Sequence, residues 1–516
     1  MNQEFTMVEI NYWAIAPLLV VVAGALIGVL VEAFVARASR HNVQLGVGLV
    51  TYLAALVVLL AKSRTEHGLT MGGSVVIDGP SVFLMAVILC FALLSLLVMA
   101  ERFGGPAADA FTPMGAATPG SDLERSAESA GWGTTEAVPL MMISVVGMML
   151  FVSSGDLLTM FVALEVLSLP LYVLTGLARR RRLLSQEAAL KYFLLGSFSS
   201  AFFLFGAALL YGYAGSVDIA RIALAIGAAS PVLDGLLLPG VALVLIGLLF
   251  KVGAVPFHAW TPDAYQGAPT PVTGFMAAAT KIAAFGAILR LAYVGLSGNR
   301  WDWEPALIAI AALTMVIGAV MTVTQTDVKR LLAYSSIAHA GFILVAVMSF
   351  DVTGVSGAMF YLVCYGFTTI AAFALVTLVR HEGSEATDLS QWAGLGRRSP
   401  VVAGAFAICL LAFAGIPLTS GFTAKFAAFA PAISHGGAAG AWLVVIGVLA
   451  SAVTAYVYFR IIVTMFFEEG AGDVVAITPS TLTTIAIAIG LVLTILLGVL
   501  PGPVLEAATQ SAQFLR

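Results

Sequence analysis

The chain has 516 residues, of which 60% are hydrophobic and only 10% are charged, and its mean hydropathy is +1.02. Soluble domains carry roughly 25% charged residues, so this composition excludes a soluble protein and indicates one that crosses a membrane many times. The net charge of -4 is small and gives no sign of nucleic-acid binding.

Long apolar runs dominate the chain, and a bilayer core needs about 20 such residues per helix. A β-barrel would instead show strands of about ten residues with alternating hydrophobicity. We therefore predict an all-α polytopic membrane protein whose first span is not a cleaved signal peptide, because no basic segment precedes it. The predicted spans are 12–35, 43–61, 79–100, 137–154, 157–177, 186–212, 235–254, 271–294, 305–325, 331–349, 354–379, 401–416 continuing as 420–432, 440–466 and 479–500.

Basic residues predict the orientation, because cytoplasmic loops are enriched in Lys and Arg. The richer set falls in the odd-numbered connections: Arg37, Arg40, Arg102, Arg125, Arg179, Arg180, Arg181, Arg182, Lys329, Arg330, Arg380, Arg397, Arg398 and Arg460. The even-numbered connections hold Lys62, Arg64, Arg221, Arg290 and Arg300. Both termini are therefore expected on the outer, periplasmic face.

One long polar connection, residues 101–135, is rich in Gly, Ala, Pro and Ser. Such a composition is typical of a disordered or loosely packed loop, here on the cytoplasmic side. The chain is thus expected to divide into an N-terminal three-helix segment, a loop, two five-helix halves, and a last helix with a tail. Their expected bounds are 1–100, 101–136, 137–296, 305–467 and 479–516.

Two spans are interrupted by proline within a polar stretch. The first reads LLFKVGAVPFHAWTPDAYQGAPTPV and the second AGIPLTSGFTAKFAAF. Proline breaks a helix, and a membrane tolerates such backbone only beside protein or a water-filled cavity. Paired broken helices indicate an inverted repeat. With five helices in each half, the second half would enter the membrane upside down.

Four lysines lie within apolar spans: Lys191, Lys251, Lys281 and Lys425. Ionisable groups inside a membrane are costly and mark ion paths or proton relays. A lysine removed from water can lose its proton near neutral pH, whereas an arginine keeps its charge. This pattern predicts a protein that moves protons.

Glu165 lies in the middle of the span FVALEVLSLPLYVL and needs a partner there. Lys251, just before the first break, is the natural one, and joining or separating the pair would switch the lysine between holding and releasing a proton. The alternative is a static salt bridge. Lys281, in GFMAAATKIAAFGAIL, and Lys425, just past the second break, have no acidic neighbour in their spans and are predicted to be relay lysines.

Lys191 has a second explanation, because Glu187 precedes it by four residues and this spacing favours a local ion pair on a helix. A relay role and a local pair are both open for this lysine. His258 and His339 titrate near neutrality and could bridge two lysines, or each could be hydrogen-bonded to backbone in a polar pocket.

Other polar residues have simpler explanations. Asp263 is predicted to cap the short helix after the first break, and Asp327 the tenth span. The run from Arg179 to Arg182 is read as the topology signal or a lipid headgroup contact.

No sequence motif for a cofactor is present: there is no Walker loop, no GxGxxG before a helix and no metal-ligand spacing. The three cysteines, Cys90, Cys364 and Cys409, lie in apolar segments and are read as core residues. We expect no cofactor or metal in this chain. The energy for pumping must then come from a partner protein or from another ion gradient.

Five segments together resemble the antiporter-like membrane subunits of respiratory complex I, the NADH–quinone oxidoreductase. They are FVALEVLSLPLYVLTG, EAALKYFLLGSFSSAFFLFG, KVGAVPFHAWTPDAYQGAPTPVTGFMAAATK, TDVKRLLAYSSIAHAGF and GIPLTSGFTAKF. The resemblance runs from about 12 to 500 and implies fourteen helices in two inverted halves. It also implies a glutamate–lysine pair at Glu165 and Lys251, a central lysine at Lys281, a terminal lysine at Lys425, and a further lysine at Lys191.

Within this family the resemblance is closest to the N type. The M type carries glutamate where this chain has Lys425, and the L type adds a long lateral helix after the core. The Mrp-type sodium–proton antiporters share the lysine set and are the nearest rival. The 101–135 loop is longer than the N type leads us to expect.

The resemblance implies a proton-translocating subunit of an enzyme, in the inner membrane of a bacterium, with no redox chemistry of its own. FMN, iron–sulfur clusters and quinone would be bound by partner subunits. Neighbouring antiporter-like and small membrane subunits would be direct partners, alongside the lipid bilayer. A third possibility is a structural anchor whose lysines only hold helices together.

Overall fold

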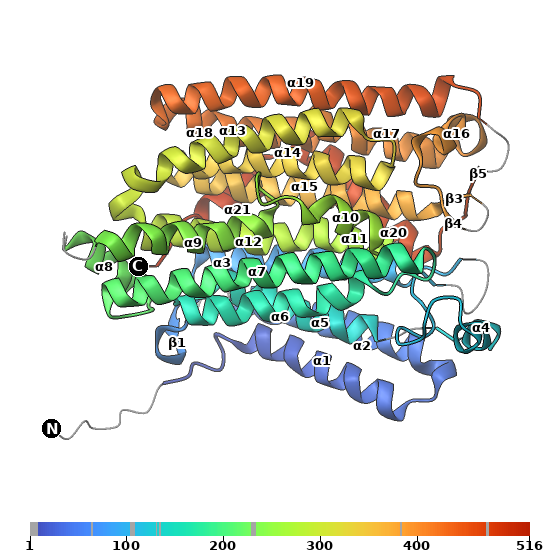
Figure 1. Ribbon diagram of the computed structural model, residues 1–516, viewed down its shortest axis with the longest axis horizontal. Helices are drawn as coiled ribbons and strands as arrows, with labels where there is room; N and C mark the ends of the chain where they lie inside the picture. Colours follow the sequence, from blue (N-terminus) through green and yellow to red (C-terminus); the bar gives the residue numbers. More distant parts are fainter. Residues whose placement is uncertain are drawn as a thin grey trace.

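The computed structural model describes residues 9–62, 66–103, 109–130, 132–133, 136–228, 234–381, 384–470 and 474–515. Long helices run side by side along the longest axis of the molecule (Figure 1). The longer helices are α1 (Ala16–Phe34), α2 (Arg37–Lys62), α3 (Gly79–Met99), α5 (Ala137–Val152), α6 (Leu157–Thr175), α7 (Arg182–Ala214), α9 (Asp234–Val252), α12 (Lys281–Arg290), α13 (Arg300–Thr324), α14 (Val328–Val347), α15 (Val352–Leu378), α17 (Pro400–Ala414), α18 (Ser420–His435), α19 (Gly437–Phe467) and α20 (Thr481–Val499).

Short elements connect these helices. The short helices are α4 (Asp122–Ser129), α8 (Ile219–Gly227), α10 (Trp260–Gly267), α11 (Thr270–Phe275), α16 (Leu395–Arg398) and α21 (Gly502–Gln510). Strands β1 (Gly68–Thr70) and β2 (Val75–Ile77) form an antiparallel pair. Strands β3 (Val379–His381), β4 (Ser384–Glu385) and β5 (Val474–Ala476) form a second antiparallel sheet in the order β4-β3-β5.

Helices occupy all the predicted spans, so the all-α membrane architecture is confirmed. Among the described residues, twelve helices are long and apolar enough to cross a membrane, and α5 and α17 are shorter apolar helices. The predicted number of crossings and the inverted repeat stay predictions.

Side-chain caps explain where several helices begin. Asp78 accepts a hydrogen bond from the Ser81 N–H at the start of α3, and Asp156 does the same for Thr159 at the start of α6. Asp327 caps α14 by accepting from the Arg330 N–H, at 3.0 Å, which confirms the predicted cap. A capping side chain satisfies one of the free donors of the first turn.

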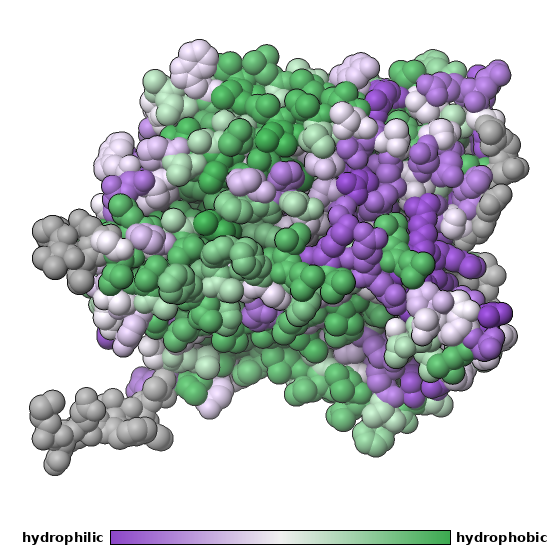
Figure 2. Space-filling view, in the orientation of Figure 1, coloured by the Kyte–Doolittle hydropathy of each residue, from purple (hydrophilic) through white to green (hydrophobic). Residues whose placement is uncertain are grey.

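Both described chain ends lie at one end of the molecule, on the left in Figure 1. The Asn11 N–H donates to Thr70 Oγ1 at 2.8 Å, and the Leu515 N–H donates to Asp78 Oδ2 at 3.2 Å. The other end carries α4, α16 and the β4-β3-β5 sheet, where most of the hydrophilic surface gathers in this view (Figure 2). The end with the sheet is thus the one rich in basic connections.

Both predicted helix breaks are present. The chain leaves α9 after Val252 and resumes as α10 at Trp260, and it leaves α17 after Ala414 and resumes as α18 at Ser420. Each break begins at a glycine with positive φ, +75° at Gly253 and +81° at Gly415. Only glycine adopts this conformation without strain.

The helix that carries Lys281 is composite rather than regular. It joins α11, a π-helical turn η3 (Met276–Thr280), α12 and a second π-helical turn η4 (Leu291–Gly295). The sequence predicted one plain span over 271–294. Single π-helical turns are frequent at functional sites, and one of them ends directly before Lys281.

The 101–135 connection is packed where the structure describes it, so the expected loose packing is wrong for 109–130. Arg182 is 7% exposed, and its guanidinium donates to Glu124 Oε1 at 2.7 Å and to the Ala117 carbonyl at 3.1 Å. Arg179 pairs with Asp109 at 3.0 Å. These two arginines therefore hold the loop rather than serving only as a topology signal. Residues 104–108, 131 and 134–135 lie outside the described part.

Replacing Arg182 with methionine is expected to release this loop. The substitution leaves Glu124 buried without its cation, and removing one partner of a buried pair costs about 3–5 kcal/mol. Limited proteolysis of the membrane-embedded protein should then cleave within residues 101–136 faster than in wild type. Arg397→Met, at an exposed arginine of α16, should leave the rate unchanged. Equal rates for Arg182→Met and wild type would show that Arg182 does not organise the loop.

Candidate functional site

Three of the four lysines predicted within spans are buried among the helices: Lys251 at the end of α9, Lys281 at the start of α12, and Lys425 in α18. Their residues are 4%, 2% and 8% exposed. A lysine in such surroundings needs hydrogen-bond acceptors or a counter-charge, because burial penalises the charged amine. Where each Nζ finds partners therefore defines the site.

Lys251 and Glu165 interact without touching. The Lys251 Nζ lies 5.4 Å and 5.5 Å from the ring centroids of Tyr172 and Tyr192. This Nζ is buried and has no hydrogen-bond partner among the described residues. Glu165 Oε1 is likewise buried without a partner. The carboxylate of Glu165 acts on Lys251 through space, but no ion pair joins them. The two groups therefore interact electrostatically, but the predicted ion pair is not formed in this structure.

Lys281 closes the first helix break. Its Nζ donates to the Val252 carbonyl at 2.9 Å and to the Ser336 carbonyl at 3.0 Å. Val252 is the last residue of α9, where backbone carbonyls have no partner within the helix and the helix dipole is negative. The lysine therefore caps the interrupted helix.

Lys425 closes the second break in the same way. Its Nζ donates to the carbonyls of Phe413 and Ala414, at 3.0 Å and 2.8 Å, and to Ser451 Oγ at 2.6 Å. Both carbonyls belong to the last turn of α17. A Cβ placed on Gly415 would lie 2.9 Å from Nζ, so the glycine makes room for the ammonium group. Hydrogen bonding thus makes Lys281, rather than Lys251, the counterpart of Lys425.

His339 lies within electrostatic reach of both capping lysines. Its ring interacts electrostatically with both Lys425 and Lys281. Nδ1 is hydrogen-bonded to the Tyr361 hydroxyl at 2.8 Å, and Nε2 is buried without a partner among the described residues. His339 also lines a small cavity of about 10 Å³. A histidine so placed can exchange a proton with either side.

His258 lies in the connection between α9 and α10 and is half-buried. Its Nδ1 has no partner among the described residues, and its ring centroid is 6.4 Å from that of Tyr334. The Nδ1 of this histidine is therefore not committed to a hydrogen bond with the described residues.

Hydroxyl groups near the lysines were not predicted from the sequence. The Tyr265 hydroxyl lies 3.4 Å from Ser336 Oγ, and Ser335 Oγ is hydrogen-bonded to the Tyr458 hydroxyl. The polar segment AYSSIAHAGF could have indicated them, because its two serines lie on one buried helix, α14, together with His339. These groups supply donors and acceptors between the lysines.

Lys191 lies at the surface of α7, with 46% of its side chain exposed. Its Nζ pairs with Glu187 at 2.7 Å, which confirms the predicted local pair, and with Asp263 at 3.1 Å. Asp263 also pairs with Arg330 at 2.6 Å. The predicted capping role of Asp263 is wrong: α10 begins after Ala259 with no side-chain cap, and two cations hold the carboxylate.

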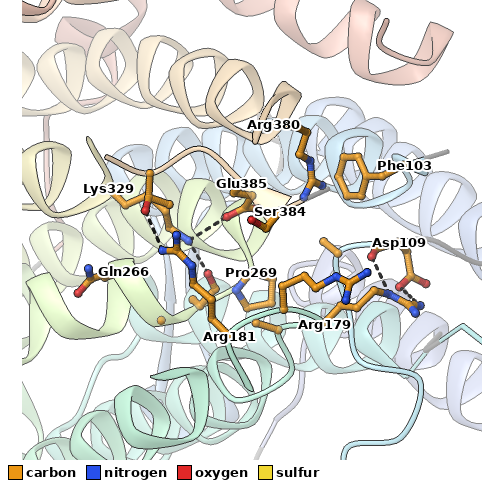
Figure 3. A pocket seen from close by; sticks show the side chains of 16 residues that line it. Phe103, Asp109, Arg179, Arg181, Gln266, Pro269, Lys329, Arg380, Ser384 and Glu385 are labelled. Atoms are coloured by element: carbon orange, nitrogen blue, oxygen red, sulfur yellow. Dashed lines mark hydrogen bonds and ion pairs between the residues drawn. The ribbon is translucent and has the colours of Figure 1, made fainter. Parts of the chain in front are cut away.

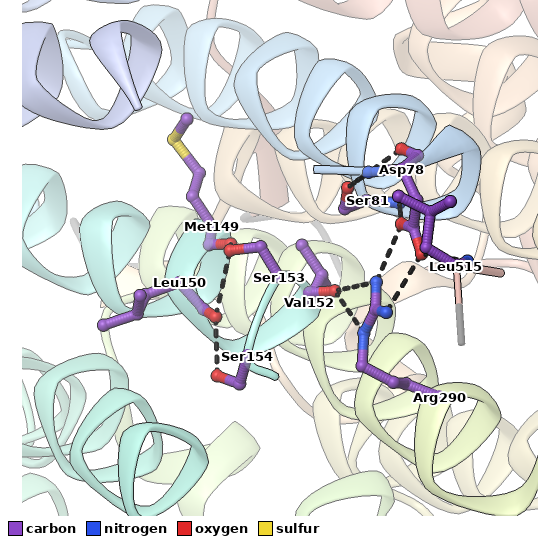
Figure 4. Close-up of polar contacts among 9 residues, drawn as sticks. All are labelled: Asp78, Ser81, Met149, Leu150, Val152, Ser153, Ser154, Arg290 and Leu515. Carbon is purple, nitrogen blue, oxygen red and sulfur yellow. Dashed lines mark hydrogen bonds and ion pairs between the residues drawn. The ribbon is translucent and has the colours of Figure 1, made fainter. Parts of the chain in front are cut away.

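A second buried charge cluster was missed in the sequence (Figure 4). Arg290 and Asp78 form a two-pronged pair, with Nη1–Oδ2 at 3.0 Å and Nη2–Oδ1 at 2.8 Å, and are 2% and 1% exposed. Arg290 also donates to the Val152 carbonyl. The cluster joins α12 to the start of α3 and the end of α5. Arg290 had been assigned to a loop, although it falls inside the apolar run 271–294.

The described residues include no group of three His, Cys, Asp or Glu side chains placed to hold a metal ion. Cys90, Cys364 and Cys409 are free thiols, and the latter two are buried. The buried amines, the imidazoles and the Glu165 carboxylate offer acid–base chemistry, because such groups can hold and pass protons.

Residues 154–454 match a family model described as NADH:quinone oxidoreductase/Mrp antiporter, TM. A relative from Streptomyces griseus, called NADH-quinone oxidoreductase subunit N 3, is 54% identical over 100% of this chain and 96% of its own length. Another, from Rhodococcus opacus and called NADH-quinone oxidoreductase subunit N, is 55% identical over 98% of this chain and 97% of its own length.

Two solved structures have a similar fold. A chain of respiratory complex I from Thermus thermophilus with bound aureothin superimposes with a TM-score of 0.76 and 33% identity, covering 95% of this chain and 98% of its own. A chain of the Mrp complex from Dietzia sp. reaches a TM-score of 0.76 at 24% identity, covering 98% and 97%. The second likeness concerns the fold alone.

Proposed function

The chain belongs to the NADH:quinone oxidoreductase and Mrp antiporter membrane family, and from this membership we propose that it is the N-type proton-translocating subunit of NADH–quinone oxidoreductase. The observation that carries the proposal is the identity of 54–55% with subunit N relatives along their whole length. The Mrp-type alternative has less support, because the similar Mrp chain is only 24% identical.

Glu165 and Lys251 form the uptake switch of this mechanism. When the carboxylate approaches Lys251, the pair favours the protonated amine. When it withdraws, the amine is left among Tyr172 and Tyr192, where burial favours the neutral form. The separated arrangement of the pair, with both atoms unpartnered, corresponds to the releasing state.

Lys281 and Lys425 are the central and terminal carriers, with His339 between them. A proton released from Lys251 passes to Lys281 at the first break, then by way of His339 to Lys425 at the second. The buried, unpartnered Nε2 of His339 and the nearby hydroxyls support this order. From Lys425 the proton leaves on the periplasmic side.

Less evidence supports Lys191 and His258 as carriers on the proton path. The ion pairs of Lys191 with Glu187 and Asp263 are at the surface, which suits a role at the rim near the uptake side. His258 lies beside the first break with an open nitrogen, and can hand a proton toward Lys281.

The remaining parts follow from membership in a larger enzyme. FMN, iron–sulfur clusters and quinone are bound by partner subunits, and neighbouring membrane subunits contact this chain within the bacterial inner membrane. The two halves, residues 137–296 and 305–467, are inverted repeats, supported by one lysine-capped break in each. Both termini face the periplasm, which is supported by the location of the described chain ends, near Asn11 and Leu515, at the end opposite the basic connections (Figure 1).

Purification through a tag on this chain tests the assignment. We expect FMN and iron–sulfur clusters to co-purify, and NADH with quinone to drive proton movement in liposomes, because the chain has no energy source of its own. Replacing sodium by choline should leave the rate unchanged. Sodium-dependent proton movement by preparations that lack flavin would instead identify an Mrp-type exchanger.

A further inference from the structure

A polar pocket lies at the end of the molecule that carries the β4-β3-β5 sheet (Figure 3). Its cavity volume is about 100 Å³. It is enclosed by the connection between α6 and α7, the connection between α10 and α11, the start of α14, and the hairpin of β3 and β4. We call it the hairpin pocket.

The charges that line the hairpin pocket are unbalanced. Two carboxylates, Asp109 and Glu385, face five cationic side chains, an excess of three positive charges. The cations are Arg179, Arg180, Arg181, Lys329 and Arg380. Such an excess repels protons and other cations and attracts anions.

Both carboxylates are already engaged. Asp109 Oδ1 pairs with Arg179 at 3.0 Å. Glu385 Oε2 lies 3.6 Å from the Lys329 Nζ and accepts a hydrogen bond from Thr270 Oγ1 at 2.6 Å. Burial raises the pKa of Glu385, but the charges of Lys329 and Arg380 more than offset this, and the pKa is lowered. The carboxylate is therefore charged, and Lys329 and Thr270 already pair with it.

The other arginines have unused donors. No carboxylate lies within ion-pair distance of Arg180, Arg181 or Arg380 among the described residues, and Arg181 donates to Thr387 Oγ1 at 2.7 Å. The Arg380 guanidinium stacks on the Phe103 ring at 3.6 Å, and its Nε is buried without an acceptor. Burial lowers the pKa of Arg380, the carboxylate of Glu385 opposes this shift, and the charge of Arg180 lowers the pKa further. A buried donor without an acceptor destabilises the structure.

We propose that the hairpin pocket binds a phosphate-type oxyanion between Arg180 and Arg380. A cavity of about 100 Å³ exceeds the roughly 10–15 Å³ that a single water needs, so it has room for a tetrahedral oxyanion. The planar guanidinium group matches such oxygens with two parallel donors. The same chemistry is offered by free phosphate and by a phospholipid headgroup, which basic pockets on the cytoplasmic side of membrane proteins also bind.

The bound anion joins two segments that are far apart in the sequence. Arg180 precedes α7, whereas Arg380 belongs to the β3–β4 hairpin that follows α15. With an anion between them their repulsion becomes an attraction, and the hairpin is held over the start of α14. This site is separate from the lysine relay and does not depend on the proposed function.

Equilibrium dialysis of the purified complex against radiolabelled inorganic phosphate, in phosphatidylcholine nanodiscs, tests the site. We compare wild type with the double variant Arg180→Gln/Arg380→Gln. The variant should lose one saturable phosphate per complex, or bind it at least tenfold more weakly. Arg397→Gln removes an exposed arginine at the same end of the molecule and should bind phosphate as wild type does.

A second arm identifies the source of the anion. Complexes are purified from nanodiscs that contain phosphatidylglycerol, and retained phospholipid is counted. One extra phosphatidylglycerol on wild type relative to the double variant, with no competition by free phosphate, would assign the site to a headgroup. Equal phosphate and equal lipid on wild type and the double variant would overturn the proposal, as would a loss of phosphate binding in Arg397→Gln.

Discussion

Lys251→Met in the assembled complex is expected to reduce proton pumping coupled to NADH oxidation by roughly 100-fold, the lower range for removing a positioned proton-transfer group. Methionine has a similar length and no titratable group, so α9 keeps its packing while the switch with Glu165 is lost. The Lys251 Nζ makes no hydrogen bond to the described residues, so its removal breaks none of their hydrogen bonds. Pumping is measured as acidification inside liposomes per NADH oxidised.

Lys62→Met is the matched control, because Lys62 lies at the end of α2, over the ring of Trp13, away from the capped helix ends. It should pump as wild type does. The amount of assembled complex must be measured beside the pumping. If Lys251→Met lowered the amount of complex while the surviving complexes pumped with wild-type stoichiometry, the lysine would be an anchor and the relay would be refuted.

The second large effect is expected at the buried Arg290–Asp78 pair. Asp78→Asn leaves the Arg290 guanidinium buried without its counter-charge, and breaking a buried ion pair costs about 3–5 kcal/mol. The variant complex should lose its fold at a lower temperature and inactivate faster on heating. Thermal inactivation of NADH-driven pumping, followed over time, is the measurement.

A comparison of two ion pairs makes this test specific. Arg300→Met removes a pair with Glu304 that is 3.8 Å long and about a third exposed on the arginine side, and surface pairs contribute about 0–1 kcal/mol. The double variant Asp78→Asn/Arg290→Met should recover part of the loss, because no uncompensated charge is left. A double variant no more stable than Asp78→Asn would show that the pair does not act as a unit.

The helices and their breaks could be predicted because the membrane imposes them locally. An apolar run of the required length has few alternatives to a helix, and proline with glycine interrupts it wherever it occurs. For the same reason Lys251, Lys281 and Lys425 were recognisable, since an ionisable group in lipid is conspicuous in the sequence.

The partners of these groups could not be predicted, because they come from other helices. Four of the five acceptors of Lys281 and Lys425 are backbone carbonyls, which every residue has and which no sequence pattern marks. The role of Asp263 was misjudged for a related reason: its cations come from α7 and α14, whereas the cap expected of it was a local interaction. The loop around Glu124 was judged by composition, but a single arginine from α7 organises it.

The two capped helix ends make protonation and backbone shape inseparable. Lys425 donates two hydrogen bonds to the free carbonyls of a helix end and Lys281 donates one, and each places its positive charge at the negative pole of that helix. When the amine gives up its proton, the pole loses its counter-charge and one donor disappears, so the freed carbonyl must find water or the backbone must turn. Release of a proton from either lysine therefore weakens the hydrogen bonding at that helix end, and uptake restores it. The flexibility of each interrupted helix thus depends on whether its lysine is protonated.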